Sequence, residues 1–222
     1  MRIIALADTH GFHHDLVLPE GDVLIHAGDL SRAGELAQVE ETLRWLRRWP
    51  HPVKIVVAGN HDRAFERPHE RARALALCAP DLTYLEDAGV TVDGVRFWGS
   101  PWQPDYHDWA FNLPRGEALA SKWQLIPEDV DVLITHGPPA GAGDRPAGAG
   151  RQGCRDLRAR VAQLRPRLHL FGHIHEDGGV WIEDGVVCVN VTAANGERGP
   201  TVIELEANLR RVQVVAAPAA AR

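Results

Sequence analysis

The chain has few cysteines, no long hydrophobic run and no excess of positive charge, and each absence argues against a class of protein. Its three cysteines lack the spacing of a zinc ligand set, and their odd number disfavours a disulfide framework. No apolar run approaches the length that spans a membrane. A net charge of −6 argues against a general nucleic-acid binder, which needs basic patches to neutralise phosphates.

What is present suits one soluble globular domain. A chain of 222 residues is long enough for one substantial domain and short for two, and 45% hydrophobic residues support a core. No repeat or linker divides it, so we expect a single domain over residues 1–215 and a frayed tail over 216–222. The first apolar segment already carries Asp8 and His10, which cleavage of a signal peptide would discard. We therefore expect a cytoplasmic protein.

Seven side chains that commonly bind metal ions stand just past short apolar runs. The runs cover residues 3–7, 23–27, 53–58, 130–134 and 168–171. Short runs rich in Val and Ile predict buried strands, and ligands of α/β sheets bind beyond the carboxyl ends of strands. Five strand ends are therefore expected to converge on one pocket. The seven candidate metal ligands are Asp8, His10, Asp29, Asn60, His136, His173 and His175.

The chemistry of these side chains indicates two divalent cations. Asp29 is the natural bridging ligand, because a carboxylate has two oxygens and can hold one ion with each. Asn60 offers a neutral carbonyl oxygen, which suits a hard or borderline dication. A mixed set of nitrogen and oxygen ligands without thiolates favours Mn²⁺, with Fe or Zn²⁺ as alternatives.

The remaining pattern alternates strands with helices in the first half and forms antiparallel hairpins later. Apolar spacing predicts helices over residues 35–49 and 66–77. Hairpin turns are predicted at Asp93-Gly94, Asp184-Gly185 and Asn208. Two packed mixed β-sheets flanked by helices satisfy both patterns, so we expect an α/β fold.

The order of the ligand motifs resembles that of the calcineurin-like metallophosphoesterases. The motifs are Asp-x-His, Gly-Asp, Gly-Asn-His-Asp, His-Gly and Gly-His-x-His, and they run from Asp8 to His175 with every ligand position of that family present. Longer stretches resemble the metallophosphoesterase-domain phosphodiesterase branch, and they cover residues 21–29, 99–104, 109–112, 131–139 and 171–176. The resemblance implies an αββα sandwich and a hydrolase with a dinuclear metal site.

The same resemblance implies a role for each residue. One ion would be held by Asp8, His10, Asp29 and His175, and the other by Asp29, Asn60, His136 and His173. Two dications about 4 Å apart acidify a bridging water, which then attacks phosphorus in line. Catalytic roles are expected for two further residues. His61 would face the leaving group as a general acid, and Asp62 would accept a hydrogen bond from its ring.

The expected substrate is a small phosphodiester or nucleotide, and cyclic nucleotides with 2′,3′ or 3′,5′ phosphates are favoured. We expect neither a polymeric nucleic acid nor a membrane as a partner. Trp102, Trp109 and Phe111 are candidates for stacking on a base, with core packing as the alternative. Arg32 and His107 are further candidates for substrate contact, with a solvated position as the alternative. The glycine-rich loop over residues 140–153 is expected to be mobile. Whether this loop or residues 102–112 contact substrate is left open.

Two other functions are considered. A phosphomonoesterase such as a protein phosphatase carries Gly-Asp-x-x-Asp-Arg-Gly, whereas residues 28–34 lack the second acid and shift the arginine by one position. A non-catalytic scaffold with this fold usually loses ligands or the histidine after the asparagine, and this chain keeps all of them.

The other histidines are expected to be structural or solvated. His26 and His169 lie inside apolar runs, so we expect them to be buried. His13 and His51 lie in polar segments, so we expect them to be solvated.

Overall fold

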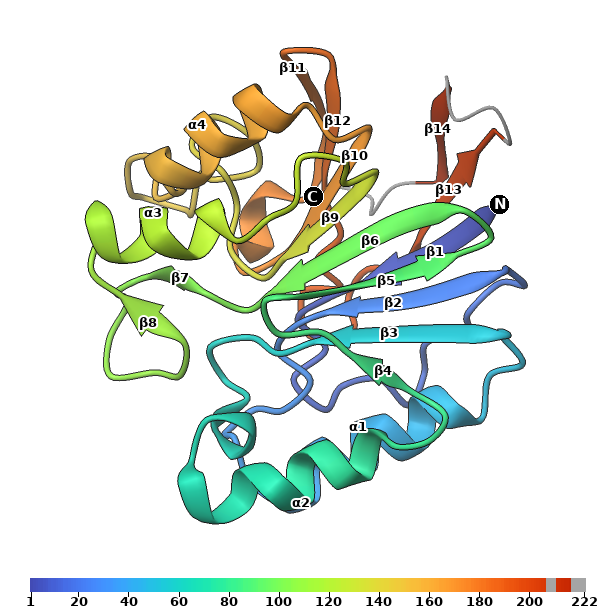
Figure 1. Cartoon of the computed structure of the whole chain (residues 1–222). Helices are drawn as coiled ribbons and strands as arrows, with labels where there is room; N and C mark the ends of the chain where they lie inside the picture. The colour runs from blue at the N-terminus through green and yellow to red at the C-terminus, as the bar shows by residue number, and fades with distance from the viewer. Residues whose placement is uncertain (207–210, 217–222) are drawn as a thin grey trace.

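The computed structural model describes residues 1–206 and 211–216 and contains two six-stranded β-sheets packed against each other, with a helical layer outside each sheet (Figure 1). This arrangement confirms the predicted α/β fold with αββα layers. A separate two-stranded sheet projects beside the second helical layer and joins β7 (Gln103–Pro104) to β8 (Asn112–Leu113).

The first sheet has four parallel strands in its centre and at one edge. Its order is β14 (Val212–Ala216), β13 (Thr201–Leu205), β1 (Arg2–Leu6), β2 (Val23–Ala27), β3 (Val53–Val57) and β4 (Thr83–Tyr84). Strands β1 to β4 are parallel, and β13 and β14 are antiparallel additions. The carboxyl ends of β1, β2 and β3 therefore lie at one edge, where the first four predicted ligands follow them.

The second sheet repeats this plan. Its order is β11 (Gly179–Glu183), β12 (Val186–Asn190), β10 (Leu168–Phe171), β9 (Val132–Thr135), β6 (Val95–Ser100) and β5 (Ala88–Val92). The four inner strands are parallel, and each edge strand is one arm of a hairpin. Two of the three predicted turns are confirmed: Asp93 and Gly94, like Asp184 and Gly185, have the positive φ angles that a two-residue hairpin loop requires.

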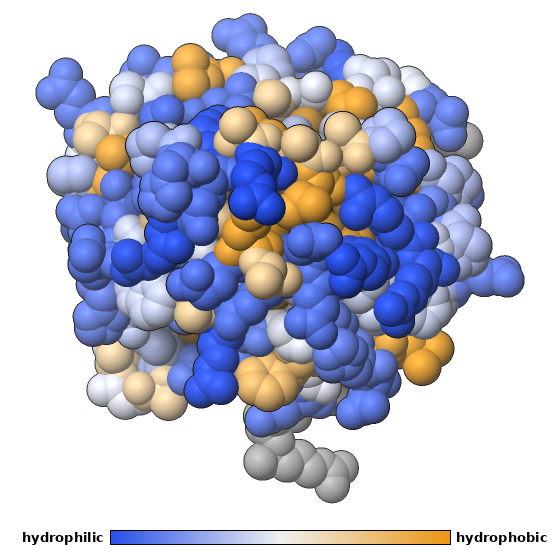
Figure 2. Space-filling view, turned by 90° about the horizontal axis from the view of Figure 1, so that it is seen from below, coloured by the Kyte–Doolittle hydropathy of each residue, from blue (hydrophilic) through white to orange (hydrophobic). Residues whose placement is uncertain are grey.

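Four helices cover the outer faces of the sheets. α1 (Leu36–Arg47) and α2 (Pro68–Cys78) cover the first sheet, and α3 (Glu117–Gln124) and α4 (Arg155–Leu164) cover the second (Figure 1). The first two confirm the predicted helices to within a few residues at each end. Seen from below, the outer surface of the α1 and α2 layer is largely hydrophilic (Figure 2). Among the helices that the structure describes, none has the length and apolar character to cross a membrane.

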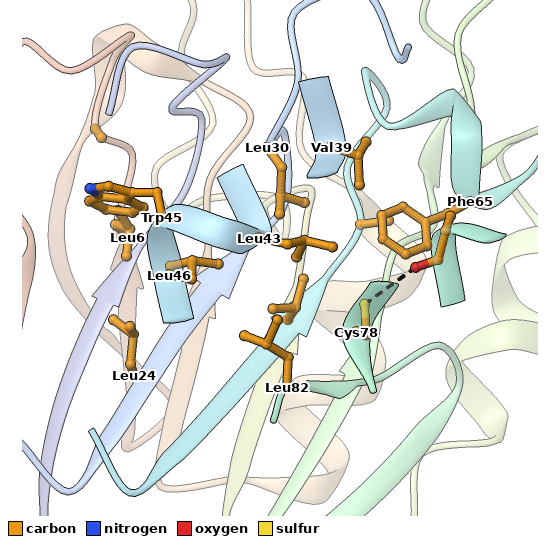
Figure 3. Close-up of a cluster of buried hydrophobic side chains, with 14 of the residues drawn as sticks. Leu6, Leu24, Leu30, Val39, Leu43, Trp45, Leu46, Phe65, Cys78 and Leu82 are labelled. Carbon is orange, nitrogen blue, oxygen red and sulfur yellow. Dashed lines mark hydrogen bonds between the residues drawn. The ribbon is translucent and has the colours of Figure 1, made fainter. Parts of the chain in front are cut away.

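Buried side chains fill both sides of the first sheet. Between the sheets, Ile3 and Ile25 pack with Phe97, Val132 and Leu170 of the second sheet. On the other side, side chains of α1 and α2 pack against the sheet (Figure 3), and this cluster includes Leu6, Leu24, Val39, Leu43, Trp45, Leu46, Phe65 and Leu82. Strand β2 is buried on both faces, which explains why its sequence reads as a continuous apolar run.

Some sequence predictions need correction. His13 is fully buried rather than solvated, because its ring packs 4.8 Å from the Trp45 ring. His51 is also buried, and its Nε2 lies 3.0 Å from the Pro19 carbonyl oxygen. The third predicted turn, at Asn208, and residues 217–222 lie outside the described residues. Ala216, assigned to the tail, is instead the last residue of β14.

Two more buried histidines support the main-chain segments that carry the ligands. His26 Nε2 lies 3.0 Å from the Thr9 hydroxyl, and His169 Nε2 lies 2.8 Å from the Thr135 hydroxyl. Both histidines are buried, as predicted. Burial lowers the pKa of each to about 3, so both stay neutral in the folded protein at neutral pH.

We predict that Leu43→Ala lowers the free energy of unfolding by about 2–5 kcal/mol, because it leaves a cavity beneath α1. Urea unfolding followed by circular dichroism measures this change. Leu125→Ala is the matched control: Leu125 is 52% exposed, so its truncation should change stability by less than about 0.5 kcal/mol. Similar losses for both variants would contradict the core position of Leu43.

We also predict that His169 makes stability fall in acid. In the unfolded chain His169 takes up a proton near pH 6.5, whereas in the folded protein burial lowers its pKa to about 3. The contribution of neutral His169 to the free energy of unfolding is therefore full above pH 6.5 and is lost as the pH falls toward 3. Between pH 7.5 and 5.5, with chelator present, the wild type should lose about 1 kcal/mol more stability than His169→Gln. Equal losses in urea unfolding would contradict a neutral, buried His169.

Candidate metal centre

All seven predicted ligands come together at the facing edges of the two sheets. In each of two groups, the nitrogen and oxygen atoms lie within 4.8 Å of one another, and the groups are Asp8, His10 and His175, and Asp29, His136 and His173. Asn60 joins the second group, because its Oδ1 lies 2.8 Å from His136 Nε2 and 2.8 Å from His173 Nδ1. Five strands, β1, β2, β3, β9 and β10, end immediately before these residues. The predicted convergence is therefore present.

Asp29 lies between the two ligand groups. Its Oδ2 lies 3.5 Å from His10 Nε2 in the first group and 3.4 Å from His136 Nε2 in the second. Its Oδ1 instead accepts a hydrogen bond of 2.8 Å from the His61 backbone N–H. One oxygen therefore faces both groups, and the other holds the loop that follows Asn60. The prediction that each oxygen holds one ion stays a prediction.

Main-chain carbonyl groups orient two of the ligand imidazoles. His10 Nδ1 lies 3.2 Å from the Ser31 carbonyl oxygen, and His136 Nδ1 lies 3.0 Å from that of Ala27. A carbonyl oxygen only accepts, so in both rings Nδ1 is the donor and Nε2 is directed at the centre. His10 Nε2 and His175 Nε2 lie 3.3 Å apart, close enough for one cation to bind both.

The electrostatics of the centre suit cations. Burial favours the neutral form of Asp29, but the neighbouring His136 and His10 outweigh it and hold the Asp29 pKa well below its usual range. Burial opposes the charged form of His136, yet Asp29 raises the His136 pKa to about 9. A proton on His136 thus balances the carboxylate when no metal is bound. Carboxylate, amide and imidazole donors without thiolates fit two divalent cations at this place.

The main chain around the ligands is in an unusual conformation. Asp8, His10, Asp29 and His173 have φ angles of 55°, 47°, 58° and 71°, in the left-handed region that non-glycine residues rarely adopt. Such residues cost about 1–3 kcal/mol each and gather at functional sites. Glycine is required at position 28, where a Cβ atom would overlap the His136 ring.

His61 lies beside both groups, and one of its ring nitrogens lies within 4.8 Å of donor atoms of His10 and Asp29. The family resemblance assigns His61 to the leaving group rather than to a metal ion. Its Nδ1 donates to the Arg32 carbonyl oxygen at 2.7 Å. Its ring meets the edge of the His10 ring at a centroid distance of 4.5 Å and stacks on the Trp109 ring at 4.0 Å. This position agrees with the expected role at the leaving group.

Asp62 does not orient the His61 ring, which corrects the prediction. Its buried carboxylate accepts hydrogen bonds from the backbone N–H groups of Leu30, Ser31 and Gly59 at 2.8–3.2 Å and from the Ser31 hydroxyl at 2.8 Å. Burial and the nearby Asp29 raise the Asp62 pKa to about 6. Asp62 therefore fixes the loops after β2 and β3 relative to each other.

A pocket of about 1040 Å³ opens over the two ligand groups. Arg32 and His61 line it, as do residues that the sequence did not single out: Phe12, Tyr106, Gln152, Asn195 and Glu197. Phe12 and Tyr106 are about half exposed, at 51% and 53%. Phe12 stands two positions after the predicted ligand His10, and Tyr106 lies within residues 102–112, which the sequence analysis left open as a substrate contact.

The glycine-rich loop forms part of the pocket wall through Pro146, Ala147, Ala149 and Gln152. Its base is tied by the buried Asp144, which accepts hydrogen bonds from Gly141 N–H at 3.0 Å and Gly153 N–H at 3.3 Å. Arg151 also pairs with Asp144. The predicted mobility of the loop stays a prediction.

Most aromatic candidates for substrate contact lie elsewhere. Phe111 is 1% exposed and belongs to the core beneath α2. Trp102 packs on Phe111, and its Nε1–H donates to Asp87 at 2.9 Å. His107 is exposed, and neither it nor Trp102, Trp109 or Phe111 is among the described residues that line the pocket. Packing, the alternative interpretation, describes Trp102 and Phe111.

Known proteins resemble this chain in sequence and fold. Metallophosphoesterase domain-containing protein 1 of Homo sapiens is 42% identical over 214 residues, which cover 86% of this chain and 65% of that protein. UPF0046 protein K07C11.7 of Caenorhabditis elegans is 40% identical over 206 residues, which cover 88% of this chain and 70% of that protein. The crystal structure of TT1561 of Thermus thermophilus has a TM-score of 0.65 at 18% identity, with 96% and 97% of the two chains covered.

The chain thus spans only about 65% of the length of the human relative, so the resemblance concerns one part of that protein. The family model described as calcineurin-like phosphoesterase matches residues 1–177, which include all seven ligands. The chain belongs to the calcineurin-like phosphoesterase family.

Proposed function

We propose that the protein is a dinuclear metal-dependent phosphodiesterase. The observation that carries the proposal is the position of Asp29 Oδ2, which lies 3.5 Å from His10 in one ligand group and 3.4 Å from His136 in the other. An oxygen shared by two ligand sets is what a bridged pair of cations requires. Family membership supports the same reaction class.

Mn²⁺ is the proposed occupant of both sites, with Fe or Zn²⁺ as alternatives, because the donors are carboxylates, an amide and imidazoles. Two such cations supply the charge that acidifies an attacking water and stabilises the entering and leaving oxygens. The chain's own residues would then bind the phosphate and supply the proton to the leaving oxygen. Arg32 lines the pocket and would contact a phosphate oxygen, and protonated His61 would give its Nε2 proton to the leaving oxygen.

Cyclic nucleotides are the proposed substrates. The pocket volume of about 1040 Å³ suffices for a nucleotide, and Phe12 and Tyr106 offer exposed rings for stacking on a base. The side-chain amides of Gln152 and Asn195 could pair with polar edges of the base. The proposal includes a cytoplasmic location, supported by three free, buried cysteines of the kind that reducing compartments maintain.

We predict that the protein loaded with Mn²⁺ cleaves bis(4-nitrophenyl) phosphate and that Asp29→Ala and Asn60→Ala abolish this activity. Metal analysis should give two ions per chain in the wild type and fewer in either variant. Glu128→Ala, which removes an exposed carboxylate before β9, at the opposite end of that strand from His136, is the control and should match the wild type. No cleavage by the wild type with any tested dication would refute the proposal. Faster cleavage of 4-nitrophenyl phosphate would favour a phosphomonoesterase.

We further predict that Phe12→Ala and Tyr106→Ala each raise KM for 2′,3′-cyclic AMP by about tenfold, because base stacking on an aromatic ring is worth about 1–3 kcal/mol. Steady-state kinetics should show little change in kcat. A ribose 2′,3′-cyclic phosphate without a base is the control substrate, and its KM should stay unchanged. Equal increases on both substrates would mean that the rings support the pocket rather than bind a base.

A further inference from the structure

We propose that Trp109 is a positioning residue for His61: it stacks on the imidazole and holds the ring plane so that Nε2 faces the leaving oxygen. The inference rests on the proposed phosphodiesterase function of the site. It assigns Trp109 a role that differs from the base-stacking role suggested by its sequence context.

The stack adds a face-to-face contact to the nearly perpendicular contact between the His61 and His10 rings, whose centroids lie 4.5 Å apart. The two ring centroids lie 4.0 Å apart, with an angle of 30° between the planes. His61 is only partly buried, and the hydrogen bond from its Nδ1 to the Arg32 carbonyl oxygen, 2.7 Å long, fixes one ring nitrogen. A ring held at one atom can still tilt about that bond. Contact with a broad aromatic face restricts the tilt and so fixes the direction of Nε2.

Trp109 is itself held close to the metal ligands. The next residue, Ala110, donates its N–H to the Asn60 carbonyl oxygen at 3.0 Å. Phe111 donates its N–H to Glu66 at 3.0 Å, and its ring is buried in the core. The Arg63 guanidinium lies 5.0 Å from the Trp109 ring centroid and donates to the Asp108 carbonyl oxygen. The indole is thus tied to the loop that carries Asn60 and His61.

A stacking platform for substrate would need an indole face open to the pocket. One face of Trp109 is covered by His61, and Trp109 is absent from the described residues that line the pocket. Phe12 and Tyr106 do line it. Trp109 therefore acts through His61 and does not touch the substrate.

The chemistry of the step indicates how to detect this role. As hydroxide derived from water forms a new P–O bond, the P–O bond to the leaving group breaks and its electron pair passes to the leaving oxygen. His61 Nε2 then gives its proton to that oxygen. A poor leaving group depends on this proton far more than a good one, which leaves as a stable anion.

The experiment compares ethyl phenyl phosphate with ethyl 4-nitrophenyl phosphate, using the full chain loaded with Mn²⁺. Trp109→Ala should lower kcat/KM for the phenyl ester by about 10–100-fold and for the nitrophenyl ester by less than about threefold, since a general acid typically contributes 10²–10⁴-fold. Trp109→Phe keeps an aromatic face and should recover most of the loss. Asp108→Ala, an exposed neighbour, is the control and should match the wild type.

A double-mutant cycle tests whether Trp109 acts through His61. In the His61→Asn background, Trp109→Ala should cause no further loss on the phenyl ester, because the two residues form one unit. An NMR readout on the metal-free protein is independent of activity. The Nδ1 proton of His61 should stay hydrogen-bonded in every variant, whereas nuclear Overhauser contacts between the His61 and His10 rings, whose centroids lie 4.5 Å apart, should be present in the wild type and Trp109→Phe and weakened in Trp109→Ala.

The outcomes separate the two proposals. Additive losses, equal losses on both esters, or unchanged contacts between the His61 and His10 rings in Trp109→Ala would overturn the positioning role while leaving the phosphodiesterase proposal intact. A wild type that cleaves neither ester with any dication would overturn both.

Discussion

The His136 imidazole fixes how close the ends of the two sheets come at the candidate metal centre. It follows β9 of the second sheet, is fully buried, and donates its Nδ1 proton to the carbonyl oxygen of Ala27 at the end of β2 in the first. The ring lies directly against the main chain of Gly28 and Gly59, where any Cβ atom would overlap it or Asp29. This contact sets the distances between the candidate ligands of one sheet and those of the other, so the geometry of both ligand groups depends on it.

Three buried carboxylates near this contact have different partners. Asp62 is satisfied by backbone N–H groups and the Ser31 hydroxyl, so it stabilises the loops. Nearby imidazoles keep the Asp29 carboxylate charged. Asp8 accepts a hydrogen bond of 3.0 Å from the His173 backbone N–H. Cations would relieve the charge imbalance that Asp29 and His136 now settle with a proton. Metal binding and the stability of this region should therefore be coupled.

The sequence was sufficient for the parts of the molecule with a regular pattern. Apolar runs located the strands, and the side chains just beyond them include the seven candidate ligands that the structure brings together, because strand ends converge in this architecture. It was insufficient where loop geometry decides. The hydrogen-bond partners of Asp62, the hydrogen bond from the His61 N–H to Asp29, the burial of His13 and the pocket positions of Phe12 and Tyr106 depend on loop conformations that no periodicity encodes.

The residues of each ligand group are far apart along the chain. His10 and His175, whose nitrogens lie 3.3 Å apart, are separated by 165 positions. During synthesis, Asp8 and His10 leave the ribosome long before the second pair of histidines exists. No early segment can therefore assemble a complete coordination shell. A cation that needs both His10 and His175 could therefore bind only after both sheets have docked.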